Sequence, residues 1–100
     1  IMMTWFITVL VNVALLGITP PVGWIQGEHP FKDKEECELM IPLTAPVIHF
    51  NLQQATRGLG EVLEIVCMTE PEWIERNVQL EHEVPAELEL KTKPKLPEGT

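Results

Sequence analysis

The distribution of charge constrains this chain most. None of the first 27 residues is charged, and all 22 charged residues follow. The 14 residues from Trp5 to Ile18 form an apolar run. That is the length of a signal-peptide core and is shorter than the roughly 20 residues of a membrane-spanning helix. We therefore expect residues 1–23 to contain an apolar N-terminal helix that serves as a signal peptide or a membrane anchor.

Three interpretations of this segment stay open. A cleaved signal peptide fits the length of the run, although no Lys or Arg precedes it and no Ala-x-Ala site follows it. An uncleaved anchor, with membrane contact confined to residues 5–25, fits the apolar character that continues to Ile25. The third is a buried helix of a soluble protein. The first two place the rest of the chain outside the cytoplasm, in the periplasm or the medium.

The acidic composition disfavours nucleic acid as a partner. The net charge is -8, the pI is about 4.7, and seven Lys and Arg residues are scattered among fifteen acids. Binding to phosphates requires clustered cations that displace counterions. Anionic membrane surfaces are disfavoured for the same reason.

Two helices are predicted between residues 33 and 60. Asp33 and Glu36 have the spacing of a capping box, and Pro42 is expected to end the first helix after about two turns. A second helix is expected to start at Thr44 and to end at the Gly58-Leu59-Gly60 stretch, which we interpret as a helix stop rather than a phosphate-binding loop.

Two strands and a further helix complete the predicted domain. Residues 24–26 and the β-branched run 61–68 are expected to be strands. The Thr69-x-x-Glu72 cap is expected to start a short helix that ends near Asn77. The fold prediction is α+β: two or three short helices against a two-stranded sheet, preceded by the apolar helix. The predicted boundaries are 1–23 for the signal peptide or anchor, 24–78 for the domain, and 79–100 for a disordered, charged, Pro-containing tail.

Cys37 and Cys67 are the two cysteines and lie 30 residues apart. In an exported domain, pairing is the natural interpretation. Closing such a loop stabilises a fold by about 3–4 kcal/mol in the chain-entropy model. Two free buried thiols, or a redox or metal role, are the alternatives.

No catalytic residue, metal ligand or cofactor site is predicted. His29, His49 and His82 lack the local spacing that presets metal-ligand geometry. The chain contains no serine, so the usual hydrolytic nucleophile is missing. Carboxylate pairs such as Glu35 and Glu36 could act as acid and base, but more often form a solvated helix face.

Trp24 and Trp73 have two interpretations. Each could fill the core, or each could be an exposed anchor for a protein partner.

One family resemblance adds to these expectations, and it spans roughly Trp24 to Cys67. The residues that carry it are Trp24, the Phe31-x-Asp33-x-Glu35-Glu36-Cys37 motif and Ile65-Val66-Cys67. This pattern resembles small exported proteins of bacteria and their phages, in which such a helix start is bridged to a cysteine near the end of a later strand. The resemblance implies an α+β fold with one disulfide and implies no activity.

Three functions follow as hypotheses. The first is a non-enzymatic, extracytoplasmic accessory or binding protein, whose partner is another envelope or membrane protein. The second is a single-span small subunit of a membrane complex. The third is a small enzyme or metal-binding protein. The oligomeric state is left open.

Overall fold

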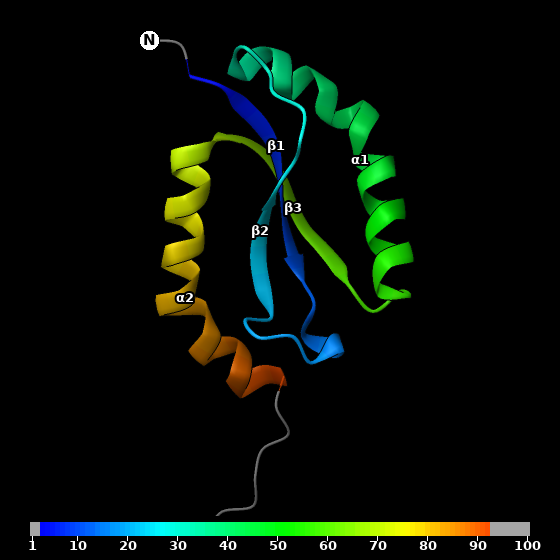
Figure 1. Cartoon of the computed structure of the whole chain (residues 1–100). Coiled ribbons are helices and arrows are strands. Elements are labelled where there is room, and N and C mark those ends of the chain that lie inside the picture. Colours follow the sequence, from blue (N-terminus) through cyan, green and yellow to red (C-terminus); the bar gives the residue numbers. More distant parts are fainter. Residues whose placement is uncertain (1–2, 93–100) are drawn as a thin grey trace, which may run out of the picture.

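A computed structural model describes residues 3–92 of the chain, with side chains through His82. The strands are β1 (Trp5–Asn12), β2 (Val22–Gln26) and β3 (Glu61–Thr69), and Ala14–Leu16 form a 3-10 turn. The helices are α1 (Lys34–Thr56) and α2 (Glu70–Thr92). The strands form an antiparallel sheet in the order β2-β1-β3, and the two helices flank it on opposite sides (Figure 1).

The predicted apolar N-terminal helix is wrong, because Trp5–Asn12 is the central strand of the sheet. Its aromatic and β-branched residues have high strand propensity. Ile7, Thr8 and Val9 are consecutive buried residues, so both faces of β1 are covered. A strand buried on both faces has no alternation of polar and apolar residues, and its apolar run cannot be distinguished from a helix by periodicity.

The sheet accordingly has three strands rather than the predicted two. The strand predicted at residues 24–26 is part of β2, and residue 23 lies inside it. Val9 pairs with Ile25 of β2 on one side and with Ile65 of β3 on the other. A cut after residue 23 would remove the strand that joins these two. Whether the chain is processed there stays a prediction.

Helix α1 is one element, and the prediction of two helices divided at Pro42 is wrong. Its start is as predicted, since the Glu36 amide donates to the Asp33 side chain at 2.8 Å. Each proline removes one helical hydrogen bond. Pro42 and Pro46 both lie on the exposed side, where water can reach the carbonyl groups left without amide partners. Figure 1 shows that α1 bends about midway.

The end of α1 is set by two residues in the left-handed region. Arg57 has φ 54° and Gly58 has φ 81°, which confirms the helix stop predicted at Gly58. The amide of Gly58 donates to the Gln53 carbonyl at 2.9 Å. The chain then turns directly into β3, the strand predicted from the β-branched run.

The predicted disulfide between Cys37 and Cys67 is present, with the two Cα atoms 6.2 Å apart. It joins the first turns of α1 to β3. Both cysteines are buried and pack with Ile7 and Phe31. Phe31 is held by backbone hydrogen bonds with Trp5 at 2.8 and 2.9 Å. This cluster is the core beneath the N-terminal part of α1.

Helix α2 begins as predicted, because the Glu72 amide donates to the Thr69 hydroxyl at 3.4 Å. It continues to Thr92 rather than ending near Asn77. Residues 79–92 of the predicted tail are therefore helical, and residues 93–100 lie outside the described part of the chain. Within that described part, neither helix combines the length and hydropathy needed to cross a bilayer.

Asn77 fastens α2 to the free edge of β2. The Trp24 amide donates to Asn77 Oδ1 at 2.8 Å, and Asn77 Nδ2 donates to the Trp24 carbonyl at 3.1 Å. Trp73 Nε1 donates to the same carbonyl at 2.7 Å. The amide side chain thus replaces a neighbouring strand and satisfies backbone groups that would otherwise favour edge-to-edge association.

We expect the Cys37→Ala/Cys67→Ala double variant to lose about 3–4 kcal/mol of unfolding free energy, because a 30-residue separation is no longer bridged in the unfolded chain. Urea denaturation followed by circular dichroism measures this. A loss below about 1 kcal/mol would show that the disulfide is not a main source of stability.

A chain that starts at Trp24 is expected not to fold. Without β1, strands β2 and β3 have no common neighbour, and a small domain has little stability to spare. The check is amide exchange and thermal unfolding of this truncated chain beside the full chain. A cooperative transition in the truncated chain would support a boundary at residue 23.

The Asn77→Ala variant is expected to lose about 1–3 kcal/mol of unfolding free energy, because the Trp24 amide is left buried without an acceptor. Gln79→Ala, at an exposed position on the same helix, is the matched control and should change stability by less than about 0.5 kcal/mol. Equal losses in both variants would mean that only helix propensity had changed.

Candidate functional site

An apolar groove lies between α1 and the sheet, with a volume of about 520 Å³. Its floor is one face of β1, from which Ile7, Val9 and Val11 project, and Ile25 of β2 continues this floor. Met40, Thr44 and Ile48 of α1 form the wall. The described residues also include a smaller hollow of about 320 Å³ beside Leu15 and Gly58, with a more mixed lining.

The groove exists because α1 does not lie centrally over the sheet. Cys37 ties the helix to β3, and Ile41 and Ile48 pack on the cluster around Ile7. The face of β2 that carries Ile25 is left uncovered. Ile25 is 53% exposed, although its neighbours on β1 are buried. Because α1 is held over β3, it covers only part of one face of the sheet. The apolar part of that same face over β2 stays open.

The end of the groove near β2 is shaped by a close backbone approach at Gly27. The Gly27 amide donates to the Ile7 carbonyl at 2.8 Å, and a Cβ at residue 27 would lie 2.7 Å from the same oxygen. Glycine is therefore required here. The turn that follows places Glu28 and His29 at the groove, where both are exposed. The His29 ring meets Phe31 edge-on, with centroids 4.6 Å apart.

The polar part of the lining is small. It consists of Glu28, His29, Thr44 and Asn51. The Thr44 hydroxyl donates to the Met40 carbonyl at 2.8 Å, within its own helix. Hydrophobic lining with a few polar groups at defined positions is typical of sites that bind small molecules.

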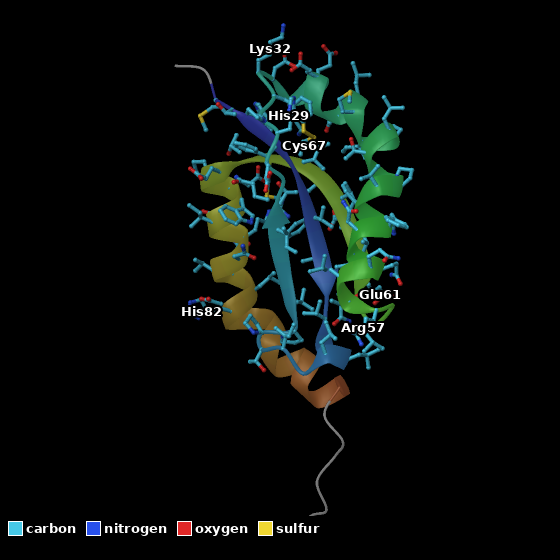
Figure 2. All side chains as sticks on the ribbon, turned by 45° about the vertical axis from the view of Figure 1, so that its right-hand side comes forward. His29, Lys32, Arg57, Glu61, Cys67 and His82 are labelled. Carbon is cyan, nitrogen blue, oxygen red and sulfur yellow. A yellow bond between two sulfur atoms is a disulfide. The ribbon has the colours of Figure 1, made fainter. Side chains whose placement is uncertain are left out.

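The structure separates most of the residues that were considered for chemistry. His29 lies near the Cys67 end of the sheet, whereas His82 is on α2 on the other side of the molecule (Figure 2). His49 is exposed on α1. Among the described residues, no group of three or more His, Cys, Asp or Glu side chains could hold a metal ion. Glu35 is exposed in the first turn of α1, and Glu36 accepts from the Lys32 amide at 3.4 Å.

Trp24 and Trp73 are brought together at the interface of β2 and α2. Trp24 is 6% exposed, and Trp73 is half-buried and donates to its carbonyl. Arg76 lies over the Trp24 ring, 5.6 Å from its centroid, and also pairs with Glu72 at 3.2 Å. Both tryptophans therefore contribute to internal packing, on the side of the sheet away from the groove.

The groove was missed by the sequence analysis because its floor is β1, which was interpreted as a helix. The signal that could have revealed it is the content of Ile, Val, Thr and aromatic residues between Trp5 and Asn12, ahead of a proline-containing connection. Comparisons with known proteins add no relative: no family model, curated protein or solved structure matches the chain. The resemblance to small exported proteins stays a prediction.

Proposed function

We propose that this chain is a non-enzymatic, extracytoplasmic binding protein that takes an amphiphilic small molecule into the groove between α1 and the sheet. The observation that carries this proposal is the apolar lining formed by Ile7, Val9, Val11 and Ile25, in which Ile25 is 53% exposed beside α1. The single-span alternative depends on an apolar N-terminal helix, and those residues form β1, the 3-10 turn and β2 instead.

The proposed compartment is supported by the disulfide. Cys37 and Cys67 are bonded, and the described part of the chain holds no free cysteine. Structural disulfides persist in oxidising compartments and are rare where thiols are kept reduced. An extracytoplasmic location, periplasmic or secreted, agrees with this chemistry.

The ligand class follows from size and charge. A volume of about 520 Å³ falls within the range of small-molecule sites, about 300–1,000 Å³. The floor suits an alkyl chain or a ring system. Glu28 lies at the groove, and the whole chain carries a net charge of -8. These charges favour a neutral or cationic head group over a carboxylate or a sulfate.

Binding is proposed rather than catalysis because the lining offers little to activate a reaction. Its titratable groups are Glu28 and His29, and both are exposed to solvent. The groove residues instead provide apolar contact area.

The experiment uses the full chain and N-phenyl-1-naphthylamine, a neutral fluorescent probe of apolar sites. We expect saturable probe fluorescence, displaced by decyltrimethylammonium below its micelle concentration and displaced about tenfold less well by decanoate, because Glu28 repels the carboxylate. The Glu28→Gln variant should reduce this head-group preference.

Asn51→Trp is the blocking variant, since a large side chain at this exposed position of the lining fills the groove without removing a core contact. We expect it to weaken probe binding at least about tenfold. Gln54→Trp, at an exposed position of α1 outside the lining, is the matched control. Equal binding by both variants, or no saturable binding by the folded wild-type chain, would contradict the proposal.

A further inference from the structure

The connection between β1 and β2 carries an exposed apolar tip. Residues 15–20 are all exposed and uncharged. Leu15, Leu16 and Ile18 are 77%, 38% and 49% exposed. Leu59, in the turn from α1 to β3, is 43% exposed and lines the same hollow as Leu15. We call these four residues the apolar tip. Exposed apolar residues that gather in one place mark an interaction site, whereas scattered single ones do not.

The backbone of this connection provides acceptors for most of its own amides. Pro20 and Pro21 have no amide hydrogen. Four further amides donate within residues 12–21, at distances from 2.7 to 3.0 Å, and these are the amides of Val13, Ala14, Leu16 and Gly17. Six of the nine residues from 13 to 21, four plus two, therefore need no donor partner from water. An unsatisfied amide is costly in apolar surroundings, so a connection built in this way loses little when it leaves water.

The charges around the apolar tip are of both signs. Arg57 and Glu61 lie two residues before and after Leu59, and both are exposed. Figure 2 shows them together at the end of α1 that is away from Lys32. The C-terminal end of α2 reaches the same end of the molecule, and residues 87–92 carry two Glu and one Lys. Acids slightly outnumber bases here, so an anionic surface is not attracted.

We propose that the apolar tip inserts into the interfacial region of a lipid surface that has zwitterionic head groups. Leu15 and Ile18 enter between the head groups. Arg57 and Glu61 stay at the level of the head groups, where a zwitterion offers a phosphate to one and a cationic group to the other. A protein partner would need a preformed cavity for each protruding side chain, whereas lipid accepts them without one.

This contact is interfacial and does not span the bilayer, because the connection is short and both its ends continue into paired strands. It is separate from the ligand groove, since no residue of the apolar tip belongs to the groove lining. The proposal therefore stands or falls independently of ligand binding in the groove.

The expected affinity is weak and reversible. The exposed fractions of the four tip residues together amount to about two whole residues. A single myristoyl chain has more apolar surface and binds membranes with a constant of about 10⁴ M⁻¹, which corresponds to half-saturation near 0.1 mM lipid. We expect half-saturation of this chain at about 1 mM accessible lipid.

The test is co-sedimentation of the full chain with phosphatidylcholine vesicles over about 0.1–10 mM lipid. The Leu15→Ser/Ile18→Ser variant should raise the half-saturation concentration at least about tenfold, because it removes the two most exposed side chains of the apolar tip. Leu43→Ser/Phe50→Ser is the matched control, at positions of α1 that are 70% and 62% exposed, and should bind like the wild-type chain. Circular dichroism of both variants verifies that they fold.

The lipid composition tests the head-group assignment. Replacing about 30% of the phosphatidylcholine with anionic phosphatidylglycerol should weaken binding about 2–5-fold at low salt, because the whole chain carries a net charge of -8. The difference should vanish at about 1 M salt, where charges are screened. Tighter binding to the anionic vesicles would overturn the zwitterionic assignment.

Tryptophan quenching tests which part of the chain enters the lipid. The emission of the Leu15→Trp variant should be quenched by brominated phosphatidylcholine. The wild-type emission should not be, because Trp24 and Trp73 are packed inside and Trp5 begins β1 at the end away from the tip. No vesicle binding by the folded wild-type chain, or binding that Leu15→Ser/Ile18→Ser retains, would overturn the proposal. So would pairing of two copies through the apolar tip in place of vesicle binding, measured by sedimentation velocity.

Discussion

The pairing of β1 with a strand on each side is the constraint on which the rest of the structure depends. β1 is hydrogen-bonded to β2 and to β3, which do not contact each other in the sheet. One face of β1 carries Ile7, which belongs to the cluster on which Ile41 and Ile48 of α1 pack, and the other face carries Thr8, which is fully buried. β1 therefore has a helix on each face and a strand at each edge, and the positions of both helices depend on it.

The two helices are attached to this sheet by different chemistry. Covalent attachment through Cys37 and Cys67 holds α1 over β3, and this off-centre position leaves the groove above β2. Helix α2 is attached by the hydrogen bonds of Asn77 and Trp73 to the Trp24 backbone, which close the edge of β2. An apolar site beside one helix and a protected edge beside the other thus follow from where each helix is fixed.

Local signals in the sequence were sufficient for the features that depend on a few neighbouring residues. The cap at Asp33, the cap at Thr69, the stop at Gly58 and the disulfide were predicted and are present. Prediction failed where tertiary contacts decide. β1 resembles a targeting helix because burial on both faces removes alternation. α1 continues through Pro42 because the lost hydrogen bonds lie on its exposed side. The groove was not predictable because its lining combines β1, β2 and α1.

The uncharged N-terminal segment has a different meaning once β1 is placed at the centre of the sheet. Burial explains the absence of charge within β1 and β2, since Ile7, Val9, Val11, Val22 and Trp24 all belong to the core, whereas residues 15–20 between these strands are uncharged but exposed. The same segment therefore no longer argues for a membrane anchor, and the argument for an oxidising compartment rests on the disulfide. Of the charged residues that follow, one, Glu28, lines the groove, so the apolar character of this site comes from the same buried strand that left the N-terminal segment without charge.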